Sequence, residues 1–210
     1  MRRLRVIILG SVLAGFAFAS TASACSGPRL PSNANQPIDP KRINQKLFSE
    51  VVLAWTNYHR CKSRRSELEN VRGLERAAAS HSKNMAKYLI LSHQTRVRGE
   101  QTLQKRYRKN GVRIKRGAEN ISQYFLYQTG RTRYLIRDIN SCHFSRGGQR
   151  IPRHTYASLG KLAVTDWINS GAHRKNSLNR AYERSGAGLA VTYTNEKPCG
   201  IIYVAQNFAD

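Results

Sequence analysis

Three side chains suited to metal ligation or proton transfer occur in three short motifs that lie far apart in the chain. They are His93 in the segment LSH, Glu119 in GAENI and His173 in WINSGAHRKN. Two imidazoles and one carboxylate can hold a divalent ion and leave positions for water or a ligand. The same groups can transfer protons if they lie within hydrogen-bond reach of a substrate. Either chemistry depends on a fold that brings the three motifs together.

The charge around this set argues against tight metal binding. The stretch 105–116 is dense in Lys and Arg, and no acidic residue occurs between Glu100 and Glu119. Positive charge stabilises a carboxylate but repels a cation. We therefore predict weak or no binding of a divalent ion such as zinc by His93, His173 and Glu119, and no other cofactor.

Two further interpretations use the same residues. Ser170 lies three residues before His173, and the two could form the nucleophile–base pair of a hydrolase. However, the sequence contains no Gly-x-Ser-x-Gly elbow, and no third group is evident to orient the histidine. Alternatively, His93, Glu119 and His173 form a polar cluster that orients the fold, since buried polar groups need partners. The sequence leaves these alternatives open.

The chain begins with a segment typical of a secretory signal peptide. Arginines near the start are followed by the apolar run 6–19 and by the small-x-small cleavage pattern at 22–24. The apolar run is too short for a comfortable membrane span. We predict that residues 1–24 are removed, that the mature chain has no transmembrane segment, and that the protein is secreted or periplasmic.

The four cysteines are Cys25, Cys61, Cys142 and Cys199. An exported protein meets an oxidising compartment, so disulfides can form. Cys25 follows the predicted cleavage site directly, where lipoproteins carry an acylated cysteine, although Ala22 replaces the larger aliphatic residue expected there. A soluble exported protein and a lipoprotein are both open, and we favour the former. We predict a Cys142–Cys199 disulfide because both residues lie in predicted loops, and no C-x-x-C pair indicates structural zinc.

The composition is strongly basic. Lys and Arg number 36 against 12 Asp and Glu, and the predicted signal peptide removes three arginines and no acid, which leaves a net charge of +21. Such a surface favours anionic partners and resists self-association, so we predict a monomer. In an exported protein the expected partners are anionic envelope polymers or lipid head groups, and export argues against nucleic acid. The alternative is a generally basic exported protein without a specific anionic partner.

Three amphipathic helices are predicted to position the motifs. A linker over residues 25–41, rich in Pro, Ser and Asn, has little to bury. Apolar residues then recur at helical spacing from 43 to 58, and further helices are predicted over 73–88 and 156–169. Ser170-Gly171 is predicted to end the third helix, which places His173 in a turn.

A terminal pair of strands follows, over 186–193 and 201–208. Gly186 and Gly188 open the first strand, where small residues allow close backbone approach. The second strand is apolar on both faces, which predicts a central place in the sheet. The segment 123–153 is predicted to be a long basic loop, and loops of that length are often functional or disordered.

The remaining histidines are predicted to lie outside the site. His59 and His81 fall on apolar helix faces and are interpreted as packing residues, whereas His143 and His154 are predicted to be surface residues. The basic stretch 105–116 is interpreted as a solvated helix face and loop, or alternatively as an anion-binding surface beside the His/Glu motifs.

The order of these elements resembles the CAP superfamily, which includes the cysteine-rich secretory, antigen 5 and pathogenesis-related 1 proteins, and most closely its compact bacterial branch. The resemblance covers residues 43–208 and is carried by Leu68, Leu74, Ala77, Ala78, His81 and Met85, then Ser92-His93, Glu119-Asn120-Ile121, Trp167, Ser170, His173, Arg174 and Asn176, then Gly186, Gly188 and Gln206-Asn207-Phe208. It implies an α+β fold, an α-β-α sandwich with a small antiparallel sheet between helical layers, formed by one domain over 42–210.

The resemblance also implies a cleft. In the family, two histidines and two glutamates face a central cleft, and His93, Glu119 and His173 match three of them. Ser170 stands where many relatives have the second glutamate, so the site is reduced here. The resemblance permits lipid or sterol binding. Together with the charge, it predicts a non-enzymatic exported binding module for an anionic envelope polymer or lipid. The alternative is a metal-assisted or acid–base hydrolase acting on peptide or cell-wall material.

Overall fold

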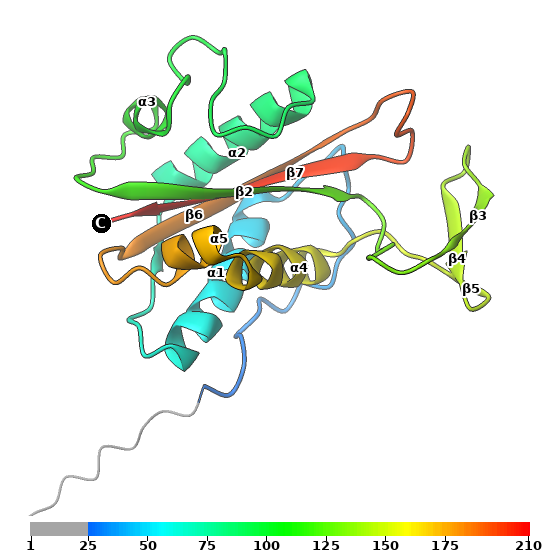
Figure 1. Ribbon diagram of the computed structural model, residues 1–210, viewed down its shortest axis with the longest axis horizontal. Coiled ribbons are helices and arrows are strands. Elements are labelled where there is room, and N and C mark those ends of the chain that lie inside the picture. Colours follow the sequence, from blue (N-terminus) through cyan, green and yellow to red (C-terminus); the bar gives the residue numbers. More distant parts are fainter. Residues whose placement is uncertain (1–24) are drawn as a thin grey trace, which may run out of the picture.

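The computed structural model describes residues 25–210, and the predicted signal peptide and its cleavage site lie outside the described residues. A four-stranded sheet lies between two helical layers (Figure 1). In spatial order its strands are β1 (Glu69–Asn70), β6 (Arg184–Thr192), β7 (Ile201–Ala209) and β2 (Gly117–Phe125). β1 pairs with β6 in parallel, and the other neighbours are antiparallel. Among the described residues, no helix is both long enough and apolar enough to cross a membrane.

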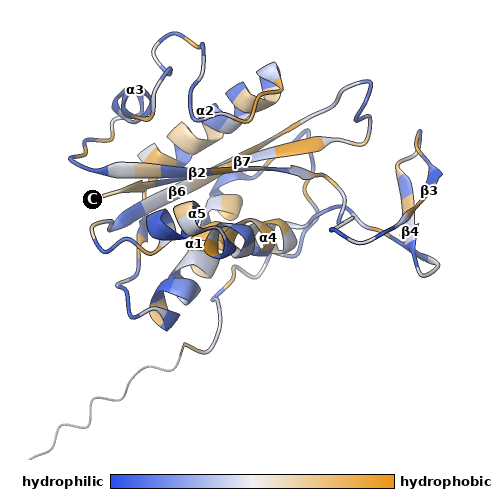
Figure 2. Ribbon diagram, viewed as in Figure 1, coloured by the Kyte–Doolittle hydropathy of each residue, from blue (hydrophilic) through white to orange (hydrophobic). Residues whose placement is uncertain are grey.

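The helices form two layers on opposite faces of the sheet (Figure 1). One face is covered by α2 (Arg72–Tyr88) with α3 (Leu103–Lys109) beside it. The other face is covered by α1 (Gln45–Lys62), α4 (Tyr156–Asn169) and α5 (Gly171–Ser177). This arrangement confirms the predicted α-β-α sandwich. Figure 2 shows that apolar residues gather where the helices meet the sheet, as burial of an amphipathic face requires.

The predicted helices and strands agree closely with the structure. The helix predicted over 156–169 is α4, and it begins with a capping box in which Thr155 and Ser158 exchange hydrogen bonds. The helix predicted over 73–88 is α2, which begins one residue earlier. Every residue of β7 is buried, and β7 lies between β6 and β2, so its predicted central place is confirmed.

The two glycines of β6 let α2 lie directly on the sheet. A Cβ atom on Gly188 would lie 2.3 Å from the backbone nitrogen of Ala79, and one on Gly186 would lie 2.2 Å from that of Glu75. No side chain fits at these distances. The close backbone approach predicted for this pair is therefore confirmed.

The segment predicted as a linker packs against the domain. Ala34 and Ile38 are buried. The Ile38 N–H donates to the carbonyl of His154 at 2.9 Å, and the Ala157 N–H donates to the carbonyl of Ala34 at 2.8 Å. The expectation that residues 25–41 have little to bury is wrong, because two isolated apolar side chains find a place beside α4. The boundary between 41 and 42 stays a prediction.

The segment predicted as a long loop over 123–153 contains strands. β2 continues to Phe125, and a second sheet contains β3 (Leu135–Asp138), β4 (His143–Arg146) and β5 (Gln149–Arg150). Its small core is aromatic, with Phe144 edge-to-face on Tyr127 and on Tyr134 at centroid distances of 5.2 and 5.6 Å. The loop prediction is wrong here because strands this short, rich in arginine, give little periodic signal.

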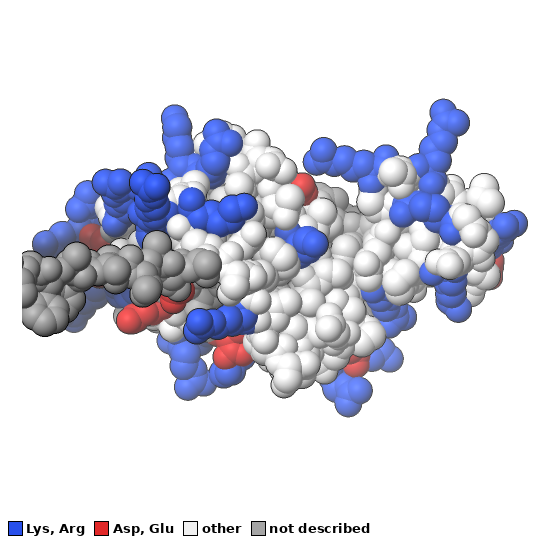
Figure 3. All heavy atoms as spheres, turned by 90° about the horizontal axis from the view of Figure 1, so that it is seen from below, with Lys and Arg blue, Asp and Glu red and all other residues white. Residues whose placement is uncertain are grey.

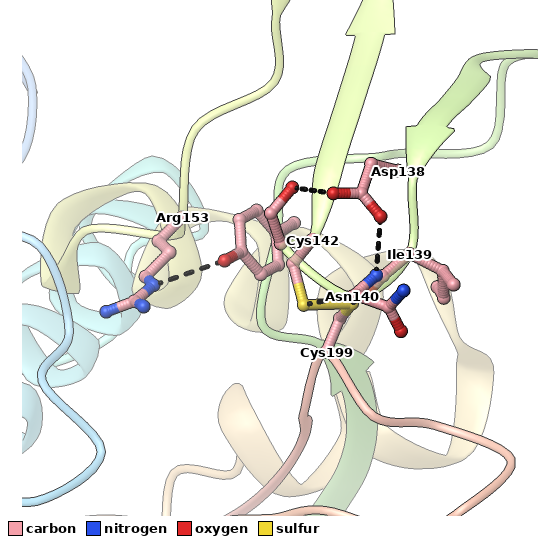
Figure 4. Close-up of a disulfide and its surroundings, with 8 residues drawn as sticks. Asp138, Ile139, Asn140, Cys142, Arg153 and Cys199 are labelled. Atoms are coloured by element: carbon pink, nitrogen blue, oxygen red, sulfur yellow. Dashed lines mark hydrogen bonds between the residues drawn. A yellow bond between two sulfur atoms is a disulfide. The ribbon is translucent and has the colours of Figure 1, made fainter.

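Two disulfides are present. Cys142–Cys199 confirms the predicted bridge and joins the second sheet to the turn between β6 and β7 (Figure 4). Beside it, the Asp138 carboxylate accepts hydrogen bonds from the Asn140 N–H and the Ser141 hydroxyl. Cys25 is bonded to Cys61. A lipoprotein would use the same Cys25 sulfur in a thioether, so this bridge and lipidation exclude each other, and the favoured soluble form stays a prediction.

His154 is buried, so the prediction of a surface residue is wrong. Its Nδ1 lies 2.9 Å from the Ser158 hydroxyl, and burial lowers its pKa from 6.5 to about 4. His143 is half-buried in β4. His59 is half-buried against the Tyr58 ring at a centroid distance of 5.3 Å, as expected of a packing residue.

The buried His154 predicts a loss of stability in mild acid. Because its folded-state pKa lies below the unfolded value of 6.5, the unfolded chain binds more protons between pH 6.5 and about 4. The stabilisation is therefore complete above pH 6.5 and is lost as the pH falls through about 4. Urea unfolding at pH 7 and pH 4.5 measures this. We expect a smaller pH dependence in His154→Asn than in the wild type, with His143→Asn as the control. Equal pH dependence in His154→Asn and the wild type would contradict the assignment.

Candidate functional site

Glu119 is the centre of a buried ion pair. It lies on β2, at the edge of the main sheet, and its side chain is 2% exposed. Arg106 on α3 is fully buried, and its Nη2 lies 2.9 Å from each of the two carboxylate oxygens. The same guanidinium donates to the backbone carbonyls of His93 and Glu100, each at 3.1 Å. Charge-assisted bonds of this kind are about twice as strong as neutral ones, so Arg106 fixes both Glu119 and the loop before α3.

Three more side chains surround the same carboxylate. His93 places Nδ1 3.0 Å from Oε1 of Glu119, while its side chain is 57% exposed. His81 Nε2 lies 3.5 Å from the same oxygen. In the amide orientation that satisfies both of its neighbours, Asn207 donates to Oε2 at 3.1 Å and accepts from the Ala78 N–H. Both oxygens of Glu119 are thus engaged from within the protein.

His81 is neutral. Burial is the main cause that lowers its pKa, the nearby Arg106 lowers it further, and Glu119 opposes the shift. Its Nε2 lies 2.9 Å from the carbonyl oxygen of Ser92, which requires the proton on that nitrogen. The side chain is fully buried, in agreement with a packing role, and it also holds the chain next to His93.

His173 lies in α5, and the prediction that it lies in a turn is wrong. Asn120, on β2, donates to the carbonyl of His173 at 3.2 Å, and Asn176 donates to Asn120 Oδ1 at 2.9 Å. The pKa of His173 is lowered mainly by burial and further by the nearby His93. Glu119 therefore contacts one of the two imidazoles directly, that of His93, whereas the backbone of His173 is held by Asn120, the next residue on β2.

Ser170 lies where α4 ends and α5 begins. Its backbone carbonyl accepts from the Arg174 N–H at 2.8 Å, and its hydroxyl makes no capping hydrogen bond to α5. In the described part of the chain, no hydrogen bond joins this hydroxyl to the ring of His173. A nucleophile–base pair needs that contact.

The site does not fit a divalent cation. Within residues 25–210, no group of three or more His, Cys, Asp or Glu side chains could hold a metal ion. The physical reason is that Arg106 occupies both oxygens of Glu119, which would otherwise be the third ligand beside His93 and His173. A guanidinium in contact with the carboxylate also repels a cation.

Arg106 and Asn207 are the site residues that sequence reasoning missed. Arg106 lies in the basic stretch 105–116, which was interpreted as a solvated face or an anion-binding surface, and nothing in the pattern separates it from Lys105 or Arg108. A carboxylate inside a strand does signal the need for a buried cation, but not which cation supplies it. Asn207 belongs to the motif Gln206-Asn207-Phe208, without a residue-specific signal for this contact.

The other cations of the basic stretch are exposed. The two acids that flank it do not neutralise it at the surface, because Glu119 is paired with Arg106, and Glu100 is buried and paired with Lys109. The cations that remain exposed are Lys105, Arg108, Arg113, Lys115 and Arg116. The Lys115 backbone N–H contacts the Asp210 carboxylate, which offsets part of this charge.

Comparison with known proteins identifies relatives. A family model described as the cysteine-rich secretory protein family, CAP, matches residues 53–208. An extracellular protein from Bacillus anthracis that contains an SCP domain is 22% identical with a TM-score of 0.51, and the match covers 83% of this chain but 44% of that one. An outer surface protein from Borrelia burgdorferi is 15% identical with a TM-score of 0.51, over 80% of this chain and 96% of that one. None of the curated proteins matches.

The two structural matches show the fold alone at these identities. This chain spans less than half the length of the Bacillus anthracis protein. The match to the Borrelia burgdorferi protein covers nearly all of that protein, so the sandwich of helices around a small sheet occurs there without large additions.

Proposed function

The chain belongs to the cysteine-rich secretory protein (CAP) family, whose members are extracellular, and from this premise we propose that it is exported and binds an anionic envelope component without catalysing a reaction. The observation that carries the proposal is the set of exposed cations on either side of the buried Arg106 in the sequence. These five cations are not neutralised by the acids on either side, since Glu100 and Glu119 are both buried and paired. We call these five residues the α3 cation segment: Lys105, Arg108, Arg113, Lys115 and Arg116.

The arrangement of Glu119 supports binding rather than catalysis. A general base must present a free lone pair to the proton that it removes. Both oxygens of Glu119 accept hydrogen bonds from Arg106, and His93 contacts one of them. Among residues 25–210, no hydrogen bond joins the Ser170 hydroxyl to a base. The proposal includes removal of residues 1–24, a secreted or periplasmic location and a monomeric protein.

Positive charge is spread beyond the α3 cation segment. Figure 3 shows Lys and Arg side chains at both ends of the face that carries α1 and α4, including the end formed by the small second sheet. A test therefore has to distinguish binding by the α3 cation segment from binding by the overall charge of the protein. Two exposed arginines provide the comparison: Arg133, just before β3, and Arg150, in β5.

We expect salt-sensitive binding to isolated cell-wall material and to polyphosphate, used as a soluble anionic polymer. Each cation near an anionic surface contributes about 1 kcal/mol, so Arg108→Gln/Arg113→Gln should weaken binding roughly ten-fold or more. Arg133→Gln/Arg150→Gln removes the same charge and should weaken it much less. Binding can be measured by sedimentation at increasing ionic strength, because screening weakens exposed ion pairs. Absent or salt-insensitive binding would contradict the proposal, and equal losses in both pairs would favour general charge.

A further inference from the structure

The end of α2 exposes four apolar residues in succession. Tyr88, Leu89, Ile90 and Leu91 are 44%, 50%, 52% and 47% exposed. Single exposed apolar residues are ordinary on a protein surface, but a contiguous exposed run marks an interaction site. We call these four residues the apolar tip. Figure 2 shows the end of α2 and the chain that follows it.

The backbone of the apolar tip is strained. Leu89 is the C-cap of α2, with φ 56° and ψ 34° in the left-handed region, and its N–H donates to the carbonyl of Met85. Glycine is the usual residue at such a helix end, because a side chain there is unfavourable. The chain therefore places a leucine, exposed to water, where glycine would be more stable. Strain of this kind points to a use for the side chain outside the fold.

The apolar tip borders a hollow of about 500 Å³. Met85, Tyr88 and Ile90 supply apolar lining, and Gln94 and Arg96 supply polar lining. The lining residues come from the end of α2 and from the loop that leads to α3. An occupant there would meet both apolar side chains and a cation.

The surroundings of the apolar tip are cationic. No acidic residue occurs between Arg76 and Gly99. Lys83, Lys87, Arg96 and Arg98 are exposed in this range, and the Lys87 ammonium lies 5.3 Å from the centroid of the Tyr88 ring. Glu100, the next acid along the chain, is buried and paired with Lys109. Figure 1 shows α3 on the same side of the sheet but near the start of α2, so the cations around the apolar tip are those of α2 and of the loop before α3.

We propose that the apolar tip inserts into the surface of an anionic lipid bilayer, while the flanking lysines and arginines contact lipid phosphates. A protein partner would explain the exposed apolar residues but not the acid-free cationic surround. An amphipathic segment with Tyr and aliphatic residues between cations has the composition that binds at the boundary between head groups and acyl chains. This inference rests on the proposed function, because it names an anionic bilayer as the envelope component.

The test measures how strongly the protein binds to vesicles of equal parts phosphatidylglycerol and phosphatidylcholine. Leu89→Ser/Ile90→Ser should lower the partition coefficient at least about ten-fold, since burial of aliphatic groups contributes in proportion to their apolar area. The matched control is Leu135→Ser/Ile136→Ser on β3, where the side chains are 55% and 60% exposed. It should change binding less than about two-fold. Vesicles of phosphatidylcholine alone should bind the wild type weakly.

A second measurement reports insertion directly. Ile90→Trp should be quenched by brominated lipids in the anionic vesicles, whereas Tyr58→Trp on α1, which covers the opposite face of the sheet, should not be quenched. Equal vesicle binding by Leu89→Ser/Ile90→Ser and the wild type, or an unquenched Ile90→Trp, would overturn the inference. Salt-sensitive binding to polyphosphate without binding to vesicles would overturn it too, and would leave the proposed function standing. Binding to neither probe would overturn both.

Discussion

Replacing Arg106 with methionine should lower the free energy of unfolding by about 3–5 kcal/mol, the cost typical of removing one partner of a buried ion pair. Methionine keeps most of the length of the side chain but none of its charge. Glu119 would then be left buried without a cation, and the carbonyls of His93 and Glu100 would lose their donor. Urea unfolding, followed by circular dichroism, measures the change.

Two further variants separate the ion pair from the general effect of lost charge. Arg108→Met removes an exposed arginine two residues away on the same helix, and should change stability by less than about 0.5 kcal/mol. Adding Glu119→Leu to Arg106→Met removes the unpaired carboxylate. The double variant should therefore lose less free energy of unfolding than the two single variants lose together. If Arg106→Met costs no more than Arg108→Met, the buried pair does not have the role assigned to it.

Gly188→Ala should destabilise the protein by about 3 kcal/mol, at the upper end of the range for an overfilled core. The added Cβ would lie 2.3 Å from the backbone nitrogen of Ala79 and 2.4 Å from its Cα. These are backbone atoms of α2, so no change of rotamer relieves the contact, and the helix would have to move away from the sheet. Thermal and urea unfolding both measure the loss.

Gly171 provides the matched control. A Cβ on Gly171 would meet nothing within 4 Å, and the residue begins α5. Gly171→Ala should therefore be neutral or stabilise by roughly 0.5–1 kcal/mol, because alanine favours a helix and restricts the unfolded chain. A loss in Gly188→Ala no larger than that in Gly171→Ala would show that α2 does not press on β6 as the structure indicates.

The elements that could be predicted are those in which buried residues recur at a regular spacing along the sequence. α2 and α4 each bury one face along their full length, so the 3.6-residue period sets their bounds closely, and the unbroken apolar run of β7 indicates a central strand. The elements that were missed depend on contacts distant in sequence. Ile38 is an apolar residue in a largely polar segment, and it is buried by its place beside α4. His154 is likewise buried by its neighbours in space.

The site shows the same division. His93 contacts Glu119, and the His173 carbonyl accepts a hydrogen bond from Asn120, the residue after Glu119. That the three motifs form a functional site stays a prediction. The helical position of His173 was missed because Ser170-Gly171 indicates a helix end, whereas Ser170 both ends α4 and begins α5. Arg106 was missed because charge and spacing alone do not distinguish a buried arginine from an exposed one.

The order of the sheet has a consequence for how the chain acquires its structure. α1, α2 and α4 all precede β6 and β7 in sequence, yet α1 and α2 pack on these strands, and β2 pairs with β7. During synthesis, the helices therefore have no sheet to cover until residues 184–209 have been made. Pairing at such separations is slow, because the entropy cost of closing a long loop comes before the stabilising contacts form. For a chain exported as proposed, this delay keeps the polypeptide open enough to thread through a translocation channel.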